Sequence, residues 1–147
     1  MQVAASAQFV HLLANSEAVS AKAGNIEPAH LWMGVLKLVD PCLKRNLDLL
    51  GVPEEAQGEV LDCAKRIRRY LEVNVREAAT RRHALRQELR GGDDASPPAI
   101  SIAFLHRSQA AKDIFAEAER ISAEQGAARL SARHLAEALV NAGMLAG

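Results

Sequence analysis

The sequence has few aromatic residues and no net charge. Five of its 147 residues are aromatic, and 18 basic residues balance 18 acidic ones. A β-sandwich or barrel needs more aromatic and β-branched side chains to fill its pleated faces. A balanced charge provides no global field toward nucleic acid or an anionic membrane. The scarcity of aromatic residues therefore argues against a β-sandwich or barrel, and the balanced charge gives no reason to expect a nucleic-acid or membrane partner.

Cysteine and long apolar runs are also scarce. Cys42 and Cys63 have no CxxC spacing, which fits small buried apolar side chains in a reducing compartment. Either thiol could form a nucleophile–base pair with a histidine, but nothing in the sequence orients such a pair. No apolar run approaches the ~20 residues of a membrane span, and the N-terminal segment lacks the basic start of a signal peptide. We therefore expect a cytoplasmic protein without membrane contact.

Alanine and leucine are abundant, with 28 and 18 residues. Both are strong helix formers. The length suits one domain with a single hydrophobic core. The composition therefore predicts an all-α fold in one domain, residues 1–147.

The apolar spacing of the first 50 residues predicts successive helices. Ser6 is the expected cap of the first helix, which carries Phe9 and Leu13 on its apolar face. The second helix begins at a proline and is apolar nearly all round, with Trp32 near its start. Phe9, Val10, Leu13 and Trp32 are the candidates for a peptide-binding groove, although helical spacing suits plain core packing equally well. Val10 falls off the main apolar face, so we expect it to be the most exposed of the four.

A helical pattern continues almost unbroken from Glu54 to Arg90. One helix of that length would be ~55 Å long, whereas a compact domain of this size is ~38 Å across. The helix must therefore break or project. Residues 73–75 are the expected break, because two β-branched residues around an asparagine form helices poorly.

Basic residues concentrate in the second half of that stretch. Residues 65–90 hold nine of the 18 basic residues and only three acidic ones. Such a helix could follow nucleic-acid phosphates. However, acidic residues open the stretch, and acid-first, base-last is also the order that the helix dipole favours on a solvated face. With Tyr70 alone available for stacking on bases, we favour the solvated face over nucleic acid.

The beginning of the sequence recurs after a Gly-, Ser- and Pro-rich linker at 91–103. Ala14, Ser20 and Ala21 recur 102 residues later, and the Pro-Ala-His-Leu run at 28–31 is echoed by Ala-Arg-His-Leu at 132–135. Ser108 and Ser131 are the expected caps of the two recurring helices. The pattern predicts a pseudo-twofold tandem repeat, with repeat one at 6–90 and an incomplete repeat two at 104–147. Either the sequence is cut at its end, or the long fourth helical segment or a partner chain covers the incomplete repeat.

These features resemble the N-terminal domain of the Clp unfoldases, the AAA+ ATPases such as ClpA, ClpB, ClpC and ClpV. The resemblance rests on Ile-Glu-Pro-Ala-His-Leu at 26–31, Leu-Asp-Leu-Leu-Gly-Val at 47–52 and the recurrence of the first two helices. Gly-Ala-Ala-Arg-Leu at 126–130 is most similar to ClpV, the sheath-disassembling ATPase of type VI secretion. The resemblance implies a module that docks a protein substrate, an adaptor or a secretion-sheath peptide for an AAA+ ATPase in cis or in trans.

The sequence contains no phosphate-binding GxxxxGK[ST] loop, so we do not expect the chain itself to be an ATPase or another enzyme. His30 and His134 hold equivalent places near their helix starts, but a metal site needs a further convergent ligand, so we expect no metal and no cofactor. The alternative function is a free-standing regulatory or structural protein of the same fold. That protein would dimerise or bind nucleic acid through its basic segment.

Overall fold

A computed structural model describes residues 2–92 and 94–144 of the chain. Within these residues the all-α prediction is confirmed: the chain forms seven helices and two strands of two residues each. Residue 93 of the predicted linker and the last three residues of predicted repeat two lie outside the described residues. The elements are β1 (Gln2–Val3), α1 (Ala5–Ser20), α2 (Pro28–Lys37), α3 (Leu43–Leu49), α4 (Glu54–Leu71), α5 (Val75–Arg90), α6 (Gln109–Glu124), β2 (Arg129–Leu130) and α7 (Ala132–Asn141).

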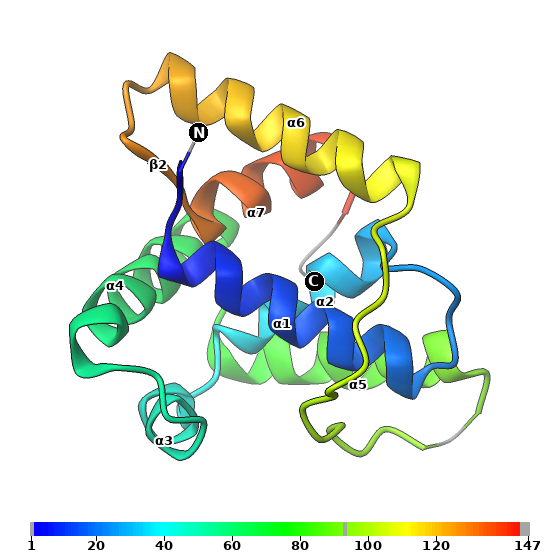
Figure 1. Cartoon of the computed structure of the whole chain (residues 1–147). Helices are drawn as coiled ribbons and strands as arrows, with labels where there is room; N and C mark the ends of the chain where they lie inside the picture. The colour runs from blue at the N-terminus through cyan, green and yellow to red at the C-terminus, as the bar shows by residue number, and fades with distance from the viewer. Residues whose placement is uncertain (1, 93, 145–147) are drawn as a thin grey trace.

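The core is centred on α1 and α2, which cross in the middle of the molecule (Figure 1). Gly34 makes this close crossing possible, because a Cβ atom at that position would lie 2.7 Å from the carbonyl oxygen of Val10. Val10 is consequently fully buried. The expectation that Val10 is the most exposed of the four groove candidates is therefore wrong. Helix α2 covers this face of α1, because Gly34 lets the two backbones approach closely.

The other helices surround this pair. Helix α5 packs against α2, whereas α4 packs against α1 and α7, and α6 packs against α7 (Figure 1). No helix of the described ranges is long and apolar enough to cross a bilayer.

The segments that precede four of the helices pair with one another. Strand β1, which precedes α1, runs parallel to β2, which precedes α7. A parallel bridge likewise joins Ile26, just before α2, to Arg107, just before α6. The entry to each helix of the first pair is thus tied to the entry of a helix of the later pair.

Two of these helices begin in the same way. The N–H of Glu27 donates to Nδ1 of His30 at 2.9 Å, and the N–H of Ser131 donates to Nδ1 of His134 at 3.0 Å. Ser131 is therefore the N-cap residue of α7, as predicted. Ser108 also caps as predicted, with its hydroxyl accepting the N–H of Ala111 at 3.1 Å.

The predicted cap at Ser6 is wrong, because the N-cap of α1 is Ala4, two residues earlier, and the helix begins at Ala5. The carboxylate of Glu59 in α4 accepts both the N–H and the hydroxyl of Ser6, at 2.6 and 2.7 Å. The same hydroxyl accepts the N–H of Ala132, the first residue of α7, at 2.9 Å. An acidic residue distant in sequence therefore binds an orphan N–H of α1, and Ser6 serves the start of α7 instead of its own helix.

The long stretch 54–90 breaks at the predicted place. Helix α4 ends at Leu71, Glu72 takes a left-handed conformation with φ of 52°, and α5 begins at Val75. The side chain of Asn74 caps α5 by accepting the N–H of Glu77 at 2.8 Å. The asparagine that weakened the continuous helix therefore starts a new one.

Candidate functional site

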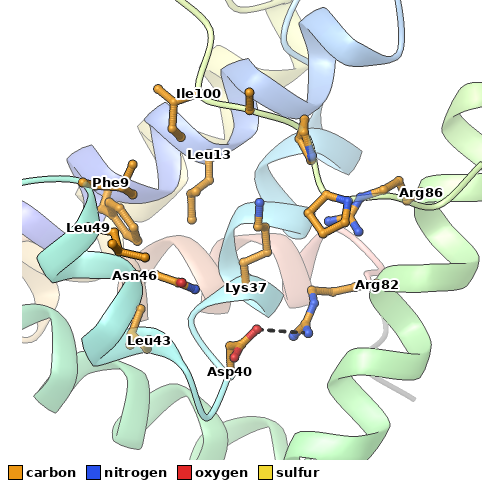
Figure 2. A pocket seen from close by; sticks show the side chains of 14 residues that line it. Phe9, Leu13, Lys37, Asp40, Leu43, Asn46, Leu49, Arg82, Arg86 and Ile100 are labelled. Carbon is orange, nitrogen blue, oxygen red and sulfur yellow. Dashed lines mark hydrogen bonds and ion pairs between the residues drawn. The ribbon is translucent and has the colours of Figure 1, made fainter.

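A groove of about 420 Å³ lies between α1, the end of α2, α3 and α5, and residues 97–100 close one side of it (Figure 2). Its lining is mainly apolar with a small charged group. The lining residues are Phe9, Leu13, Lys37, Asp40, Leu43, Asn46, Leu49, Leu50, Arg82, Arg86, Pro97, Pro98, Ala99 and Ile100.

The apolar wall comes from α1, from α3 and from the segment before α6. Phe9 and Leu13 contribute the α1 side and are almost fully buried. Leu49, at the end of α3, is 74% exposed, and the adjoining Leu50 is also exposed. Exposed leucines beside an apolar cavity are typical of a surface that receives another apolar group.

The charged floor is built around the buried carboxylate of Glu17 on α1. The guanidinium of Arg86 donates to this carboxylate from Nε at 3.1 Å and from Nη2 at 2.8 Å. Both side chains are more than nine-tenths buried. A buried ion pair of this geometry costs desolvation, and removing one partner would leave the other charge uncompensated.

Two further cations reach the groove. Lys37, at the end of α2, approaches Glu17 with Nζ 3.8 Å from Oε1. Arg82 on α5 donates to the carbonyl of Leu36 at 3.1 Å, and its Nη2 lies 3.4 Å from Oδ2 of Asp40. Figure 2 shows Lys37 rising from α2 into the middle of the group, with Arg82 and Asp40 below it. Burial lowers the pKa of Lys37 below its ordinary value, although the attraction of Glu17 acts in the opposite direction.

The segment that closes the groove is held at both ends. Arg86 donates from Nη1 to the carbonyl of Ala95 at 3.0 Å. The buried side chain of Asn15 donates to the carbonyl of Ala103 at 2.8 Å and accepts the N–H of Leu105 at 2.9 Å. Residues 94–104 therefore form a strap, which crosses in front of α1 in Figure 1 and is tied to it at Asn15 and Ser16.

The structure separates the four predicted groove residues into two pairs. Phe9 and Leu13 line the groove, together with residues that were not predicted. Val10 and Trp32 do not line it, and Trp32 is almost fully buried in the core. The apolar stripe of α1 thus serves the core and the groove at once, which periodicity alone does not reveal.

The groove residues that sequence reasoning missed include Lys37, Arg82, Arg86 and Leu49. It also missed Glu17, the buried partner of Arg86 and Lys37. Glu17 and Arg86 are 69 residues apart, so no local spacing connects them. The available signal was Glu17 itself, the one acidic residue of the first helix. Arg82 and Arg86 also lie four residues apart, on one face of a helix.

The basic stretch does not form one continuous cationic surface. Arg82 and Arg86 turn inward to the groove, and the side chain of Arg90 is largely buried beside Asp94. Four exposed cations, Lys65, Arg66, Arg68 and Arg69, gather at the end of α4, and Arg76 at the start of α5 is exposed as well. Three of the nine basic side chains of this stretch therefore serve the fold instead of a solvated face.

The histidines and cysteines do not gather into a metal site in the part of the chain that the structure describes. Among residues 2–92 and 94–144, no group of three His, Cys, Asp or Glu side chains could hold a metal ion. Cys63 is buried as predicted, and burial raises the pKa of its thiol, which favours the unreactive protonated form. Cys42 is exposed, so the prediction that both cysteines are buried is wrong. It lies at the N-terminal end of the short helix α3, outside the core.

No family model, curated protein or solved structure matches this chain. The groove and its charged floor are therefore the observations on which a function is assigned.

Proposed function

We propose that the chain is a binding module that docks an apolar helix or peptide in the groove between α1, α3 and α5. The observation that carries this proposal is the apolar wall itself, in which the exposed Leu49 and Leu50 lie beside the almost fully buried Phe9 and Leu13. An exposed apolar wall of this kind gains free energy when a partner side chain covers it, at about 25 cal/mol per Å².

We further propose that this module belongs with the Clp N-terminal domains and delivers a substrate, an adaptor or a secretion-sheath peptide to an AAA+ ATPase. The paired helix entries support this assignment, because each pairing joins the two predicted repeats. The segment before α1 pairs with the segment before α7, and the segment before α2 pairs in the same way with the segment before α6. The equivalent His30 and His134 contacts at the starts of α2 and α7 support it as well. Helix-in-groove recognition is the physical mode that such a module uses.

Binding is tested with a fluorescein-labelled, leucine-rich amphipathic peptide and the intact chain, by fluorescence anisotropy. Leu49→Ser should weaken binding about tenfold, since covering a leucine side chain contributes ~1.5 kcal/mol or more. The matched control is Ile102→Ser, because Ile102 is 95% exposed and does not line the groove. Equal affinity for wild type and both variants would reject the groove as the binding site.

The free-standing alternative is tested on the same preparation. A module of the proposed kind remains monomeric in light scattering and does not shift labelled DNA or RNA at low salt. A stable dimer, or nucleic-acid binding that weakens steeply with salt, would favour the alternative, in which the exposed cations of α4 form the contact.

A further inference from the structure

The charges in the groove floor do not balance. Three cations, Lys37, Arg82 and Arg86, surround two carboxylates, Glu17 and Asp40. The floor therefore carries one excess positive charge under an apolar wall. An uncompensated charge in a poorly hydrated site is costly unless an opposite charge joins it.

The excess belongs to Lys37, because the other two cations have closer partners. Arg86 makes three contacts shorter than 3.3 Å to the carboxylate of Glu17. Arg82 is held by the carbonyl of Leu36 and by Asp40. Lys37 has Nζ 3.8 Å from Glu17, beyond hydrogen-bond length, and its side chain is 20% exposed toward the groove.

Resting on the function proposed above, we propose that the groove takes an apolar peptide segment that carries an aspartate or glutamate side chain, whose carboxylate pairs with Nζ of Lys37. The wall formed by Phe9, Leu13 and Leu49 covers the apolar residues on either side of that carboxylate. A phosphate backbone would bring several anions and no apolar surface, so it does not match a wall of leucines above a single excess cation.

The test uses two labelled amphipathic peptides that differ at one position of the leucine-rich face, with Glu in one and Gln in the other. The wild-type chain should bind the Glu peptide about tenfold more tightly, which corresponds to one charge-assisted hydrogen bond. In Lys37→Met, which keeps the aliphatic stem, the ratio of the affinity for the Glu peptide to that for the Gln peptide should fall to about one. Lys112→Met is the matched control, since Lys112 is exposed on α6 and does not line the groove.

A measurement on the wild type alone keeps the proposal testable if Lys37→Met unfolds. The preference for Glu over Gln should shrink as sodium chloride is raised, because salt screens a partly exposed ion pair. The affinity for the Gln peptide should change little over the same range.

The outcomes distinguish this proposal from the function on which it rests. If neither peptide binds the wild type, the groove is not a docking site and both proposals fall. If both peptides bind equally, or if Lys37→Met keeps the preference for Glu, the groove function stands and the role of Lys37 is rejected.

Discussion

Replacing Gly34 by alanine should destabilise the protein, although alanine is the better helix former. A Cβ atom at position 34 would lie 2.7 Å from the carbonyl oxygen of Val10 and 3.0 Å from its Cγ1. The nearest atom belongs to the backbone of α1, so it cannot turn aside, and the two helices must separate. Overpacking of this kind costs up to ~3 kcal/mol. The gain in helix propensity returns ~1 kcal/mol, which leaves a net loss of about 2 kcal/mol.

Gly58→Ala is the matched control, because Gly58 is an exposed residue within α4 and nothing lies within 4 Å of a Cβ atom there. It should raise the free energy of unfolding by up to ~1 kcal/mol. Urea unfolding followed by circular dichroism measures both changes, and the melting temperatures should move in opposite directions, by about 4–8 °C down and 2–4 °C up. A Gly34→Ala variant as stable as Gly58→Ala would refute the close crossing of α1 and α2.

Three further predictions concern buried polar contacts. Glu17→Gln should lower the free energy of unfolding by ~3–5 kcal/mol in urea titrations, because it leaves a buried guanidinium without its carboxylate; a loss below ~1 kcal/mol would contradict the buried pair. Burial lowers the pKa of His30 and His134, so the unfolded chain binds more protons than the folded chain in acid. The contribution of these two rings to the free energy of unfolding should be complete above pH ~6.5 and should be lost as the pH falls below that value. Urea titrations at several pH values would show no such loss if the rings were already charged in the folded protein. Asn15→Ala should cost ~1–3 kcal/mol and speed amide hydrogen exchange in the strap, whereas unchanged exchange there would mean that the side chain does not hold it.

The helices were largely predictable, because local chemistry determines where they begin and end. Pro28, Asn74 and Ser108 all mark true helix starts. The failure at Ser6 has a physical cause, since the carboxylate that binds the start of α1 comes from Glu59, 53 residues away. A helix start that depends on a distant side chain leaves no local signal in the sequence.

The groove was only partly predictable for the same reason. Phe9 and Leu13 followed from helical spacing, but the charged floor joins residues from α1, α2 and α5. Periodicity records which face of a helix is apolar, and it does not record which helix covers that face. The burial of Val10 illustrates the limit, because it depends on Gly34 in another helix.

The location of the bound peptide tests the central claim most directly. Amide resonances of the intact, nitrogen-15-labelled chain are followed by NMR during titration with the Glu-containing peptide. The account predicts that the largest shifts gather around the groove, at Phe9, Leu13, Lys37, Leu49 and Ile100. Shifts concentrated on α6 and α7, with the groove residues unchanged, would contradict it.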